Sequence, residues 1–128
     1  MDNKIIKYFL EVFSENEKTY LEHVQDHGEL LQHVFYFETI NIPLSELLKK
    51  NRDVPLIEKY CTVIEYMWQN GDESVKDVVD VTILEGLSDD PEVWQNFGQY
   101  ISLDFKTYIN EELLKWNSAG MGGVEKLR

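Results

Sequence analysis

The sequence predicts a mainly α-helical domain, arranged either as an antiparallel helical bundle or as a short stack of helical hairpins. Two observations lead to this fold class. Along most of the 128 residues, apolar side chains recur three and four positions apart, which is the period of an amphipathic helix. The stretches between these segments are short and polar, so consecutive helices are expected to pack antiparallel.

The first helix is expected over residues 5–13, because its apolar residues keep helical spacing and Asp2 is suited to cap its start. A weaker helical pattern follows a short polar stretch and includes Tyr20 and Val24. Gly28 is expected to end this second helix, since glycine readily takes the left-handed conformation that commonly follows a helix.

Residues 30–42 support two interpretations. The run at 33–37 is rich in residues that favour strands, whereas Leu30, Leu31 and Val34 fit one face of a helix. A helix and a short strand near 33–37 therefore both remain open.

Prolines indicate the starts of the next two helices, because proline is well tolerated in a first helical turn. Pro43 precedes a leucine-rich segment that ends at Lys49 and Lys50, where cations complement the helix dipole. Pro55 opens a clearer helix that ends before Gly71. Its apolar stripe consists of Ile57, Tyr60, Cys61, Ile64 and Trp68.

Aspartates are expected to cap two further helices, at Asp72 and at Asp90, which precedes Pro91. The helix after Asp72 is rich in β-branched residues, which favour strands. Its apolar positions from Val75 to Leu87 nevertheless keep helical spacing, so a helix is predicted.

A last helix carries apolar residues from Tyr100 onward to Trp116. The glycines that follow predict a flexible tail. We therefore expect one helical domain over residues 1–117 and a tail over 118–128.

The charge is strongly unbalanced, with 24 acidic and 12 basic residues and a formal net charge of -12. Such a surface repels nucleic acid and anionic membranes, whose binding depends on lysine and arginine. It attracts a basic protein partner, because a potential of one sign steers oppositely charged proteins together. Solubility alone would explain the net charge equally well.

Cys61 is the single cysteine, so the chain can form no internal disulfide. It lies in an apolar stretch, where a free cysteine is usually a small buried hydrophobe. With no secretory signal and no apolar stretch of about 20 residues, the sequence predicts a cytoplasmic location.

The three histidines, His23, His27 and His33, are the strongest candidates for metal ligands. His23 and His27 share a helix face at the spacing that metal sites use, and Glu29 or His33 would complete a metal-dependent hydrolase. However, the His-Glu-x-x-His pattern is absent and Gly28 separates His33 from the other two. No nucleophile or phosphate-loop motif occurs either, so we expect neither enzyme activity nor a cofactor.

Acidic residues cluster between positions 72 and 92, where Lys76 is the only cation. The predicted partner-binding residues are Asp72, Glu73, Asp77, Asp80, Glu85, Asp89 and Asp90. Glu73, Asp77 and Asp80 are three or four residues apart on one helix flank, where like charges cost stability. A solvated face is the alternative, and a divalent metal is a weaker one, since a straight helix converges too few oxygens.

Two segments carry a family resemblance. The first is residues 28–37, with the sequence GELLQHVFYF, and the second is residues 70–75, NGDESV, continued by Val79, Val81 and the run LEGL at 84–87. Together with the final helix, they resemble a family of small acidic helical bacterial proteins, largely catalogued as domains of unknown function. These proteins are found among the immunity proteins that neutralise polymorphic or contact-dependent growth inhibition toxins.

The resemblance implies a cytoplasmic protein that blocks a toxin domain, often a basic nuclease, by covering its active site or an adjacent surface. It carries over no functional residues. The sequence therefore favours an immunity-type inhibitor with an acidic docking surface. The alternatives are the metal-dependent hydrolase with His23, His27 and His33, and a generic regulatory adaptor.

Overall fold

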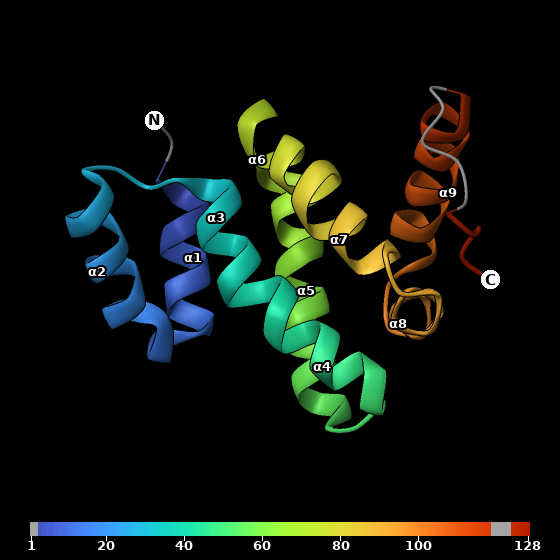
Figure 1. Ribbon diagram of the computed structural model, residues 1–128, viewed down its shortest axis with the longest axis horizontal. Helices are drawn as coiled ribbons and strands as arrows, with labels where there is room; N and C mark the ends of the chain where they lie inside the picture. Colours follow the sequence, from blue (N-terminus) through green and yellow to red (C-terminus); the bar gives the residue numbers. More distant parts are fainter. Residues whose placement is uncertain (1–2, 119–123) are drawn as a thin grey trace.

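The computed structural model describes residues 3–118 and 124–128, and within these ranges the regular structure is helical, without a strand. The mainly α-helical prediction is therefore confirmed. In Figure 1, α1 (Lys4–Val12) and α2 (Glu17–His27) lie at one end of the molecule, and α8 (Pro91–Gly98) and α9 (Leu103–Ser118) lie at the other. Asp2, the expected cap of the first helix, lies outside the described residues.

The N-terminal helices form as their spacing predicts. Helix α1 buries Ile5, Ile6 and Phe9, and a short 3-10 turn, η1 (Ser14–Asn16), leads into α2. At the end of α2, Gly28 has a φ of 76° and its N–H donates to the carbonyl of Val24 over 2.7 Å. Glycine suits this left-handed position because it has no Cβ to clash.

Residues 32–42 are helical, within the segment for which the sequence left both a helix and a strand open. Helix α3 (Gln32–Tyr36) continues through a π-helical segment, η2 (Phe37–Asn41), into α4 (Ile42–Lys50) without a break. The alternative prediction of a short strand near 33–37 is therefore wrong. Its apolar residues are accommodated on a helix that buries Phe35, Tyr36, Ile40, Leu44 and Leu48.

A second continuous helix shares this construction. Helix α6 (Glu73–Asp77) passes through the π-helical segment η3 (Val78–Leu84) into α7 (Glu85–Ser88), as the apolar spacing predicts. Segments η2 and η3 pack against each other, and the buried amide of Asn41 joins them. Asn41 Nδ2 donates to the backbone carbonyls of Thr82 and Ile83 over 3.1 and 3.2 Å.

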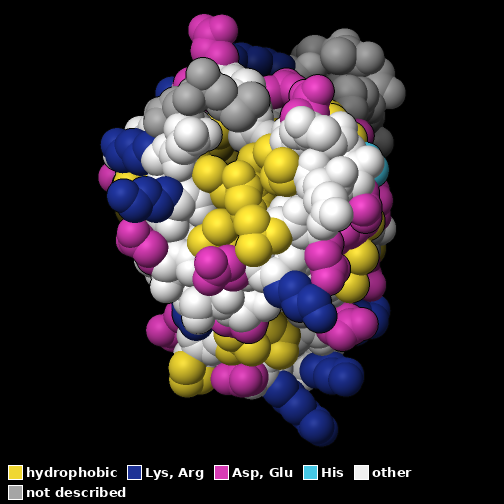
Figure 2. Space-filling view, turned by 90° about the vertical axis from the view of Figure 1, so that its left-hand side faces the viewer, with side chains coloured by type: hydrophobic (Ala, Val, Ile, Leu, Met, Phe, Trp, Pro, Cys, Tyr) yellow, Lys and Arg dark blue, Asp and Glu magenta, His cyan; other side chains and the backbone are white. Residues whose placement is uncertain are grey.

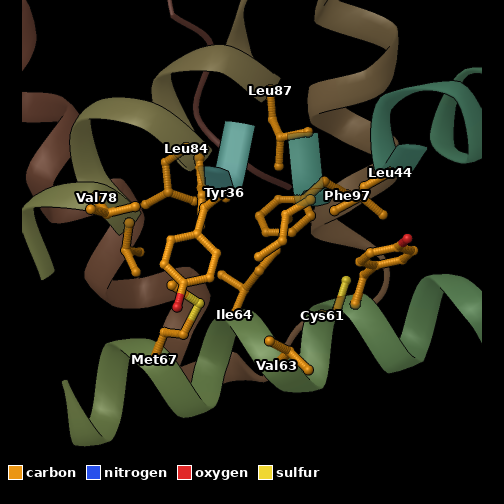
Figure 3. Close-up of a cluster of buried hydrophobic side chains, with 14 of the residues drawn as sticks. Tyr36, Leu44, Cys61, Val63, Ile64, Met67, Val78, Leu84, Leu87 and Phe97 are labelled. Carbon is orange, nitrogen blue, oxygen red and sulfur yellow. The ribbon is translucent and has the colours of Figure 1, made fainter. Parts of the chain in front are cut away.

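The long helix α5 (Val54–Asn70) contacts both π-containing helices and α1. Figure 3 shows side chains of α5 pointing toward those of the π-containing helices and toward Phe97 of α8. Cys61 is buried here, as expected, and burial raises the pKa of its thiol to about 12. Tyr36 is fully buried, and its hydroxyl, which has no hydrogen-bond partner among the described residues, lies toward Met67.

Residues 124–128 pack on the α8 and α9 end of the molecule. Leu127 is 2% exposed, and its N–H and carbonyl pair with the side-chain amide of Asn110 over 2.9 and 3.0 Å. Trp94 Nε1 donates to the carbonyl of Glu125 over 2.6 Å. Gly98 permits this packing because it leaves room for the Leu127 side chain. Of the flexible tail predicted for 118–128, residues 119–123 lie outside the described residues.

Among the helices of the described residues, none is long and apolar enough to cross a bilayer.

Candidate functional site

Two of the predicted acidic residues act as helix caps. The carboxylate of Asp72 accepts from Val75 N–H over 3.0 Å, and that of Asp90 accepts from Glu92 N–H over 2.9 Å. Lys49 also pairs with Asp90 over 2.9 Å. Hydrogen bonds lower the pKa of both aspartates below the usual range. The largest contribution comes from the Ser74 hydroxyl, which donates to Asp72, and from Lys49, which donates to Asp90.

The sequence predicted that Asp77 and Asp80 share one acidic flank, but their carboxylates face different helices. Asp77 faces α3, where its Oδ2 lies 3.4 Å from His33 Nε2. Asp80 faces α9, where the hydroxyl of Tyr108 donates to both carboxylate oxygens over 2.8 and 2.9 Å. Asp80 is half-buried, and this burial raises the pKa of its carboxyl group.

The remaining predicted residues are Glu73, Glu85 and Asp89. Glu73 and Asp89 are exposed, and Glu85 is half-buried. Asp89 lies at the end of α7 beside a surface groove. The structure thus brings Asp89 and Asp90 together at this groove, while Asp80 lies on the other side of the same helix.

The groove runs between the two π-containing helices. One wall is α3–η2–α4, and the other comprises η3, α7 and the start of α8. Three adjoining hollows make up the groove. The first hollow, at the His33 end, shares Phe37 with the second, which includes Asn41. The second shares Ser45, Glu46, Gly86 and Asp89 with the third, at the Lys50 end.

Apolar side chains lie along the groove with carboxylates among them. Phe37 and Ile42 are 45% and 47% exposed and line the same hollow, so they form a contiguous apolar surface. Glu38 and Glu46 are exposed on the same wall, and Asp89 is exposed on the other. Across residues 3–118 and 124–128, no side-chain hydrogen bond or ion pair engages any of these three carboxylates.

The sequence prediction missed Glu38, Glu46 and Asn41. The signal for them was a spacing of four in two adjacent rows of the same helix. Both rows line the groove: His33, Phe37, Asn41, Ser45 and Lys49, and Val34, Glu38, Ile42, Glu46 and Lys50. That signal could be used only once residues 30–42 were known to be helical.

Asn41 is the polar residue at the centre of the groove. It is 3% exposed, lines the middle hollow, and holds the two walls together through its Nδ2. Its Oδ1 is buried and has no hydrogen-bond partner in the described part of the chain. A buried carbonyl of this kind retains an unused acceptor, which costs free energy unless a donor reaches it.

The histidines do not converge on a metal site. His23 is buried, and its Nε2 accepts from the N–H of Leu31 over 3.0 Å, while the ring of His27 lies 4.5 Å from that of His23. His33 lies instead against η3, with Nδ1 2.6 Å from Thr82 Oγ1. In the described ranges, no group of three histidine, cysteine or acidic side chains is arranged to hold a metal ion.

Thr82, His33 and Asp77 form a hydroxyl–imidazole–carboxylate line. Such a line can activate a nucleophile where the base is held in a water-excluded site. Here the side chains of His33 and Asp77 are 49% and 60% exposed. The arrangement therefore supports a contact between α3 and η3 better than it supports nucleophilic chemistry.

A further hydrophobic patch lies on the α2 side of the molecule. Figure 2 shows hydrophobic side chains gathered at the centre of this face, and both basic and acidic side chains surround them. Leu21 of α2 is 59% exposed. Its charges are of both signs, whereas two of the three hollows of the groove are lined by carboxylates without a lysine or arginine, so this face selects a charged partner less strongly.

The fold and the groove define an all-α domain with an acidic, partly apolar surface groove. Residues 6–117 match the family described as a domain of unknown function, DUF7674, and the chain belongs to this family. No curated protein and no solved structure matches the chain.

Proposed function

We propose that this protein is an immunity-type inhibitor that binds and neutralises a basic bacterial toxin domain. The observation that carries the proposal is the set of three exposed carboxylates, Glu38, Glu46 and Asp89, without described cation partners. Carboxylates without an ion pair remain available to a cationic partner, and Glu46 and Asp89 face the same hollow, where one cation would meet both.

The net charge of -12 supports the same partner class, because it accelerates association with a basic protein and repels nucleic acid. A nuclease is the favoured toxin, since a carboxylate surface can occupy the place where such an enzyme receives phosphates. The resemblance to toxin-neutralising immunity proteins motivates this finer assignment.

The first test co-expresses the protein with the domain encoded directly upstream of it in the genome and follows growth of the host. The upstream domain alone should arrest growth, and co-expression should restore it. Continued arrest in the presence of folded, soluble protein would contradict the proposal.

The second test measures the rate of association with the same upstream domain. Replacing Glu38→Gln, Glu46→Gln and Asp89→Asn together should slow association roughly tenfold at low salt and flatten its dependence on ionic strength. The matched control replaces Glu17→Gln, Glu58→Gln and Asp104→Asn, which are exposed elsewhere and remove the same amount of charge. Equal rates for the two variants would show that net charge, and not the groove, governs association.

A further inference from the structure

We infer that the groove between the two π-containing helices binds one basic amphipathic helix of the partner protein, with a lysine or arginine side chain of that helix seated in the middle hollow. This inference rests on the proposed function, since it names the part of a basic partner that the protein recognises. A helix is the expected bound element of the partner because of the length and shape of the groove and the arrangement of its apolar and acidic residues.

The groove has the length of a short helix. Its first wall runs from His33 to Lys50, which spans about 25 Å at the rise of a helix. An amphipathic helix of four or five turns covers this length. Helix-in-groove recognition uses anchors at the spacing of i, i+3, i+4 and i+7, and apolar side chains are present at both ends of the groove to receive them.

The apolar residues lie where such anchors would fit. Val34 and Phe37 line the first hollow, Phe37 and Ile42 line the second, and Leu87 and Val93 line the third. Three of these residues, Val34, Phe37 and Ile42, are each more than 40% exposed. Burying them against a partner would be favourable by about 25 cal/mol per Å² of apolar surface.

The acidic residues lie on both walls of the same groove. Glu38 and Glu46 come from α3–η2–α4, and Asp89 comes from the opposite wall. A helix with lysines or arginines flanking its apolar face would meet a carboxylate on either side. Lys49 and Lys50 line the third hollow, where Lys49 pairs with Asp90 and Glu92. The first two hollows are lined by carboxylates without a lysine or arginine, so these two hollows select against an acidic helix.

The middle hollow has the chemistry of a pocket for a basic side chain. It has a volume of about 350 Å³. Phe37 and Ile42 offer apolar surface for a methylene stem, and Glu46 and Asp89 offer anionic oxygens for its charged end. The buried side chain of Asn41 also lines this hollow. A guanidinium or ammonium group brings the donors that these oxygens lack.

The probe is a synthetic peptide of 18 residues with leucines on one helix face and lysines on the other. Its binding to the ¹⁵N-labelled protein is followed by NMR. The amide signals of residues 33–50 and 82–93 should shift, and those of α2 should not. A peptide with glutamates in place of the lysines should bind at least tenfold more weakly. A peptide of the same composition with a scrambled order should also bind weakly, since it lacks an apolar face.

Variants with matched controls locate the site. Val34→Ser with Ile42→Ser should weaken binding of the lysine peptide about tenfold, because both side chains are exposed apolar surface in the groove. The control, Leu21→Ser with Leu103→Ser, removes two exposed hydrophobic residues elsewhere and should change binding less than twofold. Both pairs leave the core intact.

The experiments give different results if the groove inference is wrong and if the proposed function is wrong. Shifts confined to the α2 face, or equal binding of the lysine and glutamate peptides, would overturn the groove inference even if the upstream toxin domain is neutralised. Peptide binding in the groove without neutralisation of that domain would leave the groove inference standing and overturn the toxin assignment.

Discussion

The regular helix α5 and the two π-containing helices differ in the spacing of their buried residues. In α5 the buried positions alternate between steps of three and four, as in Ile57, Tyr60 and Ile64. In each of the two π-containing helices one buried stripe advances by four each time, and further buried residues such as Phe35, Val78 and Leu84 lie beside it. The stripes are Tyr36, Ile40, Leu44 and Leu48 in one, and Val75, Val79, Ile83 and Leu87 in the other.

This difference explains why the π segments form. In a regular helix, a residue four positions on is rotated by about 40°, so three such steps turn a stripe by about 120° away from the core. A wider π turn absorbs this drift and keeps the stripe facing α5. The repeat of four therefore predicts where a helix must widen, and both π segments lie within such a stripe.

The two π-containing helices are also joined to each other at their widened turns. Segments η2 and η3 meet, and the side chain of Asn41 donates to two carbonyls of η3. In the regular helix α5, Asn70 donates to the Tyr66 carbonyl of the same helix at its exposed end.

The largest effect is expected for Asn41→Ala. The substitution removes the two hydrogen bonds that join the π segments, one buried and one partly buried, so it should lower the free energy of unfolding by about 3 kcal/mol. Urea denaturation measures this. The matched control, Asn70→Ala, removes one exposed bond on the regular helix and should cost less than about 0.5 kcal/mol. Similar losses at both positions would erase the distinction between the helices.

A smaller effect is expected for Gly86→Ala. In an ordinary helix this change stabilises by roughly 0.5–1 kcal/mol. Here the new Cβ would lie 2.5 Å from Asn41 Nδ2, so the amide must move and the change should cost about 2 kcal/mol. In an Asn41→Ala background the cost should disappear, because the obstructing amide is gone. Additive losses in the double variant would contradict this mechanism.

The smallest effect is expected at Asp80, on the far side of the second π-containing helix from the groove. Burial raises the pKa of Asp80 above 3.8 in the folded protein, so the folded state binds a proton more tightly than the unfolded state. Stability at this site therefore rises as the pH falls through the raised pKa. Asp80→Asn should stabilise the protein at pH 7 by less than about 1 kcal/mol and have no effect near pH 3.

The control for this pH dependence is Asp104→Asn at an exposed position. Its unfolding free energy should follow that of the unmodified protein at both pH values. A stabilisation by Asp80→Asn that persists at pH 3 would show that the carboxylate charge is not its cause.

Helix ends were the part of the fold most open to prediction from sequence. Asp72, Asp90 and Gly28 occupy the capping positions expected of them, because capping depends on neighbouring backbone groups. The ambiguity at 33–37 arose because aromatic and β-branched residues favour strands locally. Tertiary packing against α5 decides that conflict, and no local propensity reports it.

The candidate site was less accessible to prediction. Linear clustering brought Asp77 and Asp80 into one predicted surface, although they face α3 and α9. Conversely, Glu46 and Asp89 are far apart in sequence and meet only across the groove. Which acidic residues share a face depends on how the helices pack, and periodicity within one helix cannot supply that information.

The buried thiol of Cys61 allows transient opening of the helices around α5 to be measured in the unmodified protein. Because the chain has one cysteine, and burial raises its pKa to about 12, a thiol-reactive dye can modify only molecules in which α5 has separated from its neighbours. The labelling rate thus reads the opening equilibrium at the centre of the molecule without any engineered probe. A partner that clamps the two neighbouring helices together would reveal itself by slowing that rate.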